Sequence, residues 1–283
     1  MTSVLPRVGV LAVAALALAL ALAACSSGGN SGTKVNGSCT PAHKISTVKT
    51  GVLTVALTNT PPYSFQSGND IAGIDSAIVT DLAKQECLSV EFAPYTYTTA
   101  IPAVKVGRAD VAIGGFYRTA ARAKQVTLSD PVYLDEMTLM SKDGASTVDQ
   151  LSGKRVGTVD GYLWVDDLKK LSGVATRVYP DSESLASDLK VGRLDIGIDG
   201  YGAATISTKG TNFKLEVLKN DPRIPATREP SQTAILINPN EGDLATTLNG
   251  LIAKLRSNGR LVEILKANGL PASAAEVGSP RLI

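Results

Sequence analysis

The sequence predicts an α/β protein of two lobes, each a mostly parallel sheet flanked by helices, joined by two hinge crossovers. Short apolar runs alternate with longer stretches of helical period in two successive blocks, an order typical of parallel sheets covered by helices. Extended stretches at 132–141 and 231–238 bound the second block, and a helical segment follows them. We therefore expect the chain to cross between the lobes at both stretches, which makes a hinge across which the lobes can close.

The first block starts near Val48, after a polar stretch. Its second predicted helix has Thr98 or Thr99 as the expected N-cap, and Pro102 is tolerated in the first turn because its missing N–H would have no partner there. The block is predicted to contain strands at 52–57, 88–93 and 111–113 and helices at 74–86 and 100–106.

The second block opens with Thr147 and Gln150, which have the spacing of a capping box. Asp181 is the expected N-cap of its last helix. The block is predicted to contain strands at 155–159, 175–179 and 194–198 and helices at 162–171 and 182–191.

The terminal segment carries a helical pattern, because apolar residues from Leu244 to Leu255 form a single stripe on one helix face. Such a helix must dock on a core. We expect it to complete the first lobe, which would then comprise 45–137 and 236–283, with the second lobe formed by 138–235.

The N-terminus predicts export. Arg7 precedes an apolar run from Val8 to Ala24 that is shorter than the ~20 residues a membrane span needs. The small residues before Cys25 resemble the lipobox of bacterial lipoprotein precursors, which implies a signal peptide at 1–24, an acylated Cys25 and a lipid anchor on the extracytoplasmic face of the cell membrane. An uncleaved anchor and a plain secretory signal are the alternatives. The polar stretch 25–44 then reads as a tether.

Charge and composition exclude some partners. The formal net charge is +2, and the basic residues are scattered among acidic ones, so no nucleic-acid partner is expected. The single histidine, His43, has no carboxylate cluster with ligand spacing around it, so we expect no metal and no cofactor.

Two cysteines remain once Cys25 is assigned to lipid. In an oxidising compartment the pair Cys39 and Cys87 predicts a disulfide, and a loop of that length would stabilise the fold by ~3 to 4 kcal/mol. Two unrelated thiols are the alternative.

Several local patterns occur in order along 51–268. The most specific runs from Arg122-Ala-Lys-Gln-Val to Ser-Asp-Pro-Val-Tyr133. Others lie at 51–56, 61–65, 73–75, 81–83, 97–104, 149–157 and 192–195. Together they resemble the family 3 extracellular solute-binding proteins of amino-acid ABC transporters, which have the type 2 periplasmic-binding (Venus-flytrap) fold. The resemblance implies that an amino acid binds between the lobes and is delivered to a membrane permease.

The resemblance also implies a site for a zwitterion. Arg122 falls where the family places the arginine that holds the ligand carboxylate, a task suited to a planar guanidinium with two parallel donors. Without the resemblance, Arg122 is one of three cations between 118 and 124 and fits a solvated helix face. Gly161 and Tyr162 align with a turn whose backbone N–H groups share the carboxylate. The family usually has a threonine where this chain has Tyr162.

The walls of the implied pocket are aromatic. Tyr63 and Tyr97 match family positions whose rings line the pocket. Gly115 and Tyr117 cover a stretch where the family commonly supplies a small hydroxyl residue, so we expect a narrower pocket. Trp164 is expected to pack rather than to touch ligand.

The ammonium ligand is ambiguous. The family's acid commonly lies five residues after the aspartate of a Gly-Arg-x-Asp turn, and counting from Asp195 reaches Gly200, whereas Asp199 is four residues on. One residue of slip in a strand turns a side chain to the other face. Asp199 is therefore either the ammonium ligand, if the strand bulges, or a solvated strand-end residue.

We expect a monomeric, lipid-tethered binding protein without enzymatic activity that captures a polar amino acid for an ABC permease. One alternative is an enzyme that resembles the cyclohexadienyl dehydratases of the same fold, which would need Asp75, Asp160 or Asp199 as a cleft acid. Another is a ligand-sensing lipoprotein that presents its ligand to a signalling partner.

Overall fold

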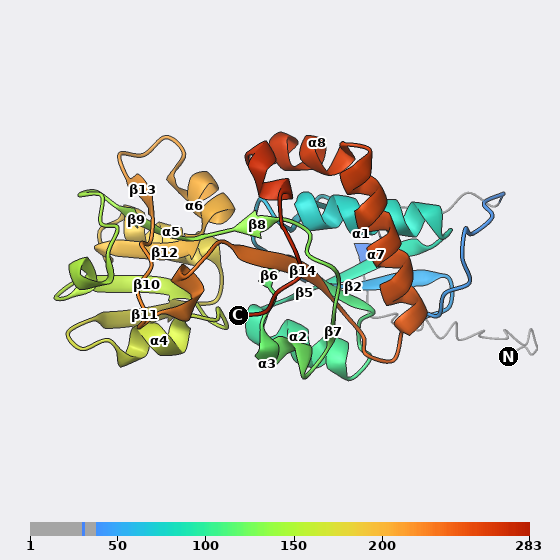
Figure 1. Ribbon diagram of the computed structural model, residues 1–283, viewed down its shortest axis with the longest axis horizontal. Coiled ribbons are helices and arrows are strands. Elements are labelled where there is room, and N and C mark those ends of the chain that lie inside the picture. Colours follow the sequence, from blue (N-terminus) through green and yellow to red (C-terminus); the bar gives the residue numbers. More distant parts are fainter. Residues whose placement is uncertain (1–29, 32–37) are drawn as a thin grey trace, which may run out of the picture.

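The chain folds into two lobes that lie side by side along the long axis of the molecule (Figure 1). This computed structural model describes residues 30–31 and 38–283. The predicted signal peptide at 1–24 and the predicted acylation site Cys25 lie outside the described residues. Within the described residues, every helix is too short or too polar to cross a bilayer.

The first lobe is a mixed sheet with helices on both faces. Its strands are β1 (Asn30–Ser31), β2 (Val52–Thr58), β5 (Ser89–Tyr95), β6 (Val111–Tyr117), β7 (Thr127–Leu128), β8 (Leu134–Asp135) and β14 (Ser231–Ile237), with a small hairpin of β3 (Phe65–Ser67) and β4 (Asp70–Ala72). Its helices are α1 (Ile74–Gln85), α2 (Tyr97–Lys105), α3 (Ala120–Ala123), α7 (Gly242–Ser257), α8 (Arg260–Ala267) and a 3-10 turn at Ala272–Ala275. The strand order is β1-β5-β2-β6-β14-β7, with β8 paired to β14. In Figure 1, α1 and α8 lie above this sheet, α2 and α3 lie below it, and α7 runs down its right-hand side.

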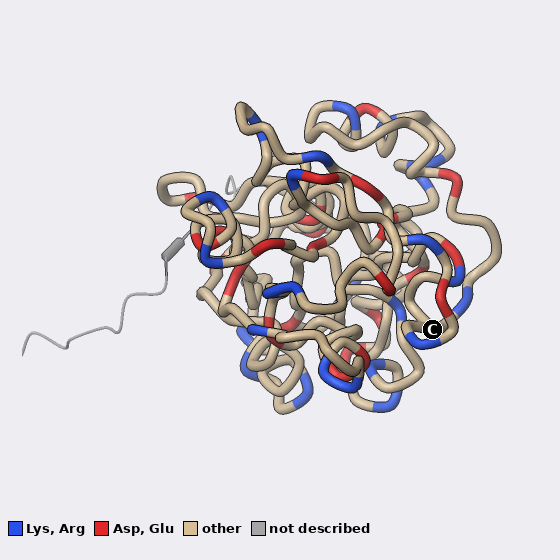
Figure 2. The backbone as a smooth tube through the Cα atoms, turned by 90° about the vertical axis from the view of Figure 1, so that its left-hand side faces the viewer, with Lys and Arg blue, Asp and Glu red and all other residues tan. Residues whose placement is uncertain are grey.

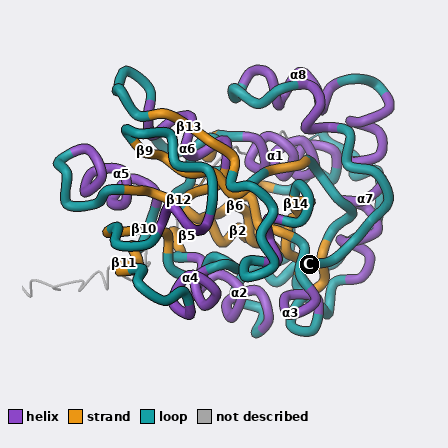
Figure 3. The backbone as a smooth tube through the Cα atoms, turned by 60° about the vertical axis from the view of Figure 1, so that its left-hand side comes forward, coloured by secondary structure: helices purple, strands orange, loops and turns teal. Residues whose placement is uncertain are grey.

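The second lobe is a smaller sheet, again between helices (Figure 3). Its strands are β9 (Met137–Ser141), β10 (Arg155–Val159), β11 (Ala175–Tyr179), β12 (Ile196–Gly200) and β13 (Lys214–Val217). Its helices are α4 (Val165–Lys170), α5 (Ser182–Lys190) and α6 (Tyr201–Thr208), with 3-10 turns at Val148–Leu151 and Pro225–Thr227. The order is β11-β10-β12-β9-β13, in which β10 runs parallel to both of its neighbours and β9 antiparallel to both of its own.

Two connections between the lobes meet as a short antiparallel ladder. In it Asp135 of β8 lies opposite Ser231 of β14. One residue, Glu136, separates β8 of the first lobe from β9 of the second. The ladder therefore lies at the crossing point that the two extended stretches predict, while the lobe boundaries at 137 and 235 stay predictions.

The predicted terminal helix is confirmed as α7. Its apolar stripe from Leu244 to Leu255 is buried, and it shares a core with α1, α8 and the first sheet. The predicted disulfide between Cys39 and Cys87 is also present, with the two Cα atoms 5.7 Å apart. The backbone N–H of His43 donates to Glu86 Oε2 at 2.7 Å. The disulfide and this bond together fix the segment around residues 39–43 to the end of α1.

Capping was predicted correctly in two places and wrongly in one. Gln150 Oε1 accepts from the Thr147 N–H at 3.0 Å, and Asp181 Oδ1 accepts from the Ser184 N–H at 2.7 Å. The cap of α2 is Thr96 rather than Thr98 or Thr99, because the Thr99 hydroxyl accepts from the Thr96 N–H at 3.0 Å and moves the helix start towards the N-terminus.

Two element boundaries differ from prediction in a way that shapes the site. α4 begins at Val165, not at 162, and its first turn carries Asp166 and Asp167, which the positive end of the helix dipole favours. β12 runs from Ile196 to Gly200 instead of from 194 to 198. Asp195 lies just before it, where its carboxylate accepts from the Arg155 N–H at 2.8 Å. Residues 162–164 and 200 are thus free to face the other lobe.

Candidate functional site

A cavity lies between the two lobes, at the hinge ladder. The free space at its centre, about 20 Å³ for the centre of a water molecule, is little more than the ~10–15 Å³ that one water needs. Aromatic side chains fill most of what lies between the lobes there. The cavity is lined by Tyr63, Tyr97, Gly115, Tyr117 and Arg122 of the first lobe, Asp135 of the crossover, and Tyr162, Leu163, Trp164 and Gly200 of the second lobe.

Arg122 is a buried cation at this cavity. Its side chain extends from the short helix α3, and the residue is only 7% exposed. Nη1 donates to the Tyr117 carbonyl at 2.8 Å and Nη2 to the Gly161 carbonyl at 3.4 Å, while the guanidinium lies 5.3 Å from the centre of the Phe116 ring. Burial lowers its pKa to about 10, so it remains charged at neutral pH.

Among the residues that the structure describes, no carboxylate lies within ion-pair distance of Arg122. A buried charge without a counter-ion is costly, and its free donors favour an anion that enters the cavity. Because Arg122 is buried, the alternative interpretation that it lies on a solvated helix face is wrong.

Gly161 lets the lobes approach at this point. Its φ is +80°, and a Cβ there would lie 2.9 Å from Tyr97 Cβ and 3.0 Å from the Thr98 nitrogen on the opposite lobe. Because α4 begins only at Val165, the helix start expected beside Gly161 and Tyr162 is wrong. Gly161 faces Arg122 with its carbonyl, and Tyr162 faces the cavity with its ring.

Asp135 is a second charged group at the cavity, and sequence reasoning missed it. Its Oδ2 accepts from the hydroxyls of Tyr63 and Tyr117, both at 2.7 Å. Its Oδ1 accepts from the Gly202 N–H at a longer 3.4 Å. Burial raises the pKa of Asp135 to about 6. The carboxylate is thus held mainly by the first lobe.

Asp199 is fully buried, so it is not the solvated strand-end residue that one alternative expected. Its Oδ1 accepts from the Tyr162 hydroxyl and from the Gly200 N–H, both at 2.8 Å. Because β12 keeps strand geometry through Gly200, residues 199 and 200 point to opposite faces, and it is Gly200 that lines the cavity. Burial raises the pKa of Asp199 to about 6.

Asp75 supports the site from behind. Its Oδ2 accepts from the N–H groups of Gly114 and Gly115 at 3.0 and 2.8 Å, and its Oδ1 accepts from the Tyr133 hydroxyl at 3.0 Å. Burial raises its pKa to about 6. These bonds fix the bend at Gly115, where a Cβ would lie 2.9 Å from the Tyr63 ring.

Gly161 contacts Arg122 without lining the cavity, and Asp199 lies behind Tyr162. The other six of the eight predicted ligand-binding residues line the cavity. Leu163, Trp164, Asp135 and Gly200 join them. Trp164 packs edge-on to Tyr117 and Tyr162 and donates to the Thr158 hydroxyl at 2.8 Å, so it both packs and lines the cavity. A glycine at the position where the sequence pattern expects an acid is the signal that could have prompted a search for Asp135.

The described part of the chain holds no group of three or more His, Cys, Asp or Glu side chains placed to bind a metal ion. Lys and Arg positions are interspersed with Asp and Glu positions along the traced backbone (Figure 2).

Known proteins are similar to this chain in sequence and in fold. A family model described as "Bacterial extracellular solute-binding proteins, family 3" matches residues 53–269. The chain is 29% identical over 212 residues to "ABC transporter arginine-binding protein 1" of Escherichia coli (strain K12), covering 72% of this chain and 84% of that protein. It is 28% identical over 219 residues to "L-cystine-binding protein TcyJ" of the same strain, covering 75% and 80%.

A solved structure described as "Crystal structure of the substrate binding protein of an amino acid ABC transporter" has a TM-score of 0.69 to this chain. The two are 24% identical, and the match covers 77% of this chain and 99% of that one. That likeness shows a shared two-lobed architecture.

Proposed function

Since the chain belongs to the bacterial extracellular solute-binding proteins of family 3, we propose that it captures a polar amino acid between its lobes and delivers it to the permease of an ABC transporter. The resemblance seen in the sequence and the predicted two-lobed type 2 fold are both confirmed. The curated relatives described above are named as amino-acid-binding proteins, one for arginine and one for cystine.

Arg122 carries the proposal. A guanidinium that is 7% exposed, lines the cavity and has no carboxylate partner among the described residues suits a ligand carboxylate, which would supply its counter-ion. The rings of Tyr63, Tyr97, Tyr117 and Tyr162 would wall the rest of the ligand.

Closure would follow from where these groups lie. Arg122 belongs to the first lobe, whereas Tyr162, which lines the same cavity, and Gly161, whose carbonyl accepts from Arg122, belong to the second. The space left between the lobes in this arrangement holds about one water, so an amino acid would enter while the lobes are further apart. A ligand that contacts both lobes as they approach shifts the population towards closure.

The anchor and the partners complete the proposal. We propose that Cys25 is acylated after removal of residues 1–24 and that a monomer is held at the extracytoplasmic face of the membrane by a tether from Cys25 to the disulfide at Cys39, because residues 39–43 are bound to the end of α1. From there the loaded lobes can reach the permease subunits.

We also propose that the protein is not an enzyme, since the relatives it matches are binding proteins. Of the acids that a dehydratase could use, Asp75 and Asp199 accept hydrogen bonds from the chain's own backbone and tyrosines. Purified protein mixed with prephenate or arogenate should release no aromatic product.

Calorimetric titration tests the binding function. We expect at least one polar L-amino acid to bind, and its α-carboxamide, which keeps the ammonium but lacks the carboxylate, to bind at least ~100-fold more weakly. If the twenty common amino acids all fail to bind, or if the carboxamide binds equally well, the proposal is wrong.

A further inference from the structure

Among the residues that line the cavity, two carry charge, and both are held by the first lobe. Arg122 donates to the Tyr117 carbonyl at 2.8 Å. Asp135 accepts from the Tyr63 and Tyr117 hydroxyls at 2.7 Å. Tyr117 therefore contacts both charged groups, the cation through its carbonyl and the anion through its hydroxyl.

Gly200 makes room for Asp135. A Cβ at position 200 would lie 2.4 Å from Asp135 Oδ2 and 2.8 Å from the Tyr63 hydroxyl, so any side chain there would displace the carboxylate. The carboxylate thus occupies the space that a strand-end side chain at 200 would fill. The neighbouring acid, Asp199, points to the other face of β12 and bonds Tyr162.

We propose that Asp135, carried by the hinge strand β8, is the counter-ion for the ammonium group of the ligand, and that the cavity is matched to a net-neutral amino acid. This rests on the proposed function, because it assumes a zwitterion whose carboxylate pairs with Arg122. One cation and one anion among the lining groups complement one anion and one cation of the ligand, and no second lining carboxylate is left for a cationic side chain.

The electrostatics favour a cation beside Asp135. Its Oδ1 has the long contact to Gly202 and can accept more, since a carboxylate offers about four acceptor sites. The carboxylates of Asp75 and Asp199 are close enough to add negative potential, and Asp135 in turn raises the pKa of both. A ligand ammonium relieves this repulsion.

The position of Asp135 on the hinge strand affects the order in which the ligand meets the two lobes. Asp135 lies opposite Ser231 in the β8–β14 ladder, next to the single residue that leads into the second lobe. Both charged partners of the zwitterion are then present on the first lobe before the lobes meet. The second lobe would complete the site with Tyr162, Leu163 and Trp164.

Paired ligands separate this role from a merely structural one. The probes are L-serine, L-asparagine and L-glutamine, the desamino acid of each (the same carboxylic acid without the amine), and L-arginine as the cationic probe. In Asp135→Asn, which keeps the shape of the side chain, we expect the affinity ratio of amino acid to desamino acid to fall at least ~10-fold, because only the amino acid loses a charge-assisted bond. Asp199→Asn is the matched control and should leave that ratio within about threefold.

Gly200→Ala provides a second variant that leaves Asp135 itself intact. Its Cβ would push the carboxylate aside, so the same selective loss of the amino acid is expected. A circular-dichroism melt of each variant checks that it is folded.

Each other outcome overturns the inference. An equal loss of both ligands in Asp135→Asn would mean that the residue only holds the fold. Selective loss in Asp199→Asn instead would make Asp199 the ammonium ligand and leave the proposed function standing. Tighter binding of L-arginine than of every neutral amino acid would refute the net-neutral class. Failure of every amino acid to bind the unaltered protein would remove the proposed function itself.

Discussion

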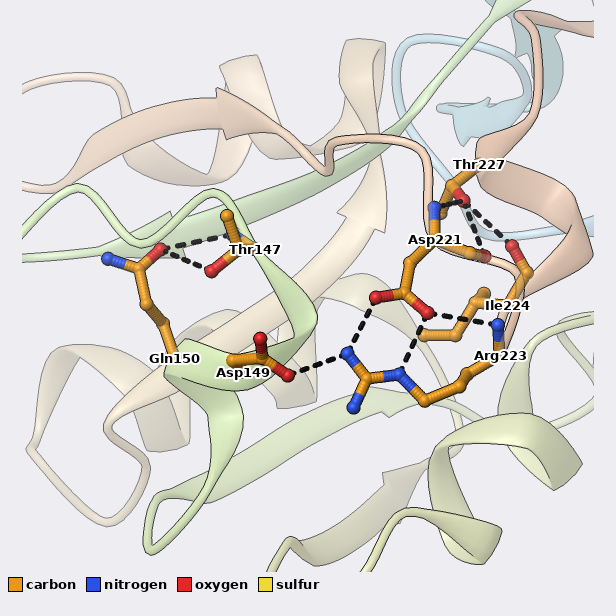
Figure 4. A network of polar contacts seen from close by, with 7 residues as sticks. All are labelled: Thr147, Asp149, Gln150, Asp221, Arg223, Ile224 and Thr227. Carbon is orange, nitrogen blue, oxygen red and sulfur yellow. Dashed lines mark hydrogen bonds and ion pairs between the residues drawn. The ribbon is translucent and has the colours of Figure 1, made fainter.

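Arg122 at the cavity and Arg223 on the second lobe carry the same charge in opposite surroundings. The Arg223 side chain is 47% exposed, and its guanidinium donates to Asp221 at 2.6 Å and to Asp149 at 2.7 Å (Figure 4). Arg122 is buried and bonds backbone carbonyls, with no carboxylate partner among the described residues. An exposed arginine is thus given two acids, and a buried one none.

The acids differ between the two regions as well. Hydrogen bonds from Arg223 lower the pKa of Asp221 to about 2. At the cavity, burial raises the pKa of Asp75, Asp135 and Asp199 to about 6. The surface network is therefore satisfied within the fold, whereas Arg122 at the cavity has no carboxylate partner among the described residues. Unmet charge of this kind is typical of a binding site.

The largest effect is expected from replacement of Arg122. In Arg122→Ala we expect amino-acid affinity to fall at least ~100-fold, about 2.7 kcal/mol, because two charge-assisted bonds to a carboxylate are lost. Calorimetric titration measures it. An affinity within threefold of the unaltered protein would show that Arg122 does not hold the ligand.

The pH dependence of stability separates the two sets of acids. A carboxyl whose folded pKa is about 6, against about 3.8 when unfolded, binds its proton more tightly in the folded state, so its stabilisation is present at low pH and is lost as pH rises through 6. We expect the ligand-free protein to be more stable at pH 5 than at pH 7.5, by ~1 kcal/mol for each of the three buried aspartates.

Urea unfolding at the two pH values checks this, and Asp135→Asn should reduce the difference by ~1 kcal/mol. Glu241, whose pKa burial raises to about 8, acts in the same direction. Asp221, with its pKa near 2, would lose its contribution only below about pH 4. Stability that rises from pH 5 to pH 7.5 would contradict this assignment.

A methyl group at Gly161 tests whether close contact between the lobes is needed for binding. In Gly161→Ala the new Cβ would press on Tyr97 and Thr98 of the other lobe, so we expect about a 10-fold loss of affinity through disfavoured closure. Gly153→Ala is the control, since Gly153 has a similar φ of +73° but nothing within 4 Å of its Cβ position.

Both variants should lose a similar ~1 kcal/mol of stability to backbone strain, measured by urea unfolding. Equal affinities of the two variants for the amino acid would mean that the lobes need not meet as closely as they do here.

The smallest effect is expected at Arg223. In Arg223→Ala, affinity for the amino acid should stay within about twofold and the melting temperature should hardly change, because exposed ion pairs contribute little. Differential scanning calorimetry and ligand titration measure the two quantities. A large loss of binding in this variant would erase the contrast with Arg122.

Patterns of short range were enough to predict much of this protein. The spacing of hydrophobic residues predicted the two βαβ blocks and the buried stripe of α7. The ordered motifs predicted that Arg122 and the tyrosines lie at one site. Cysteine counting predicted the bond between Cys39 and Cys87. Such features depend on residues that are near in sequence or on a spacing that a family keeps.

The position of Asp135, which we propose as the ammonium partner, was decided by tertiary structure alone. Asp135 is 72 residues from Tyr63 in sequence, and their contact exists only once the crossover strand lies between the lobes. Likewise, the register of β12 turned Asp199 away and Gly200 inward, and no local pattern fixes where that strand ends. The sequence by itself determined that a cation, Arg122, belongs at the site that we propose for a ligand carboxylate. Packing decided which acid lines the same cavity, because a side chain's neighbours across a cleft are set by the docking of whole elements rather than by spacing along the chain.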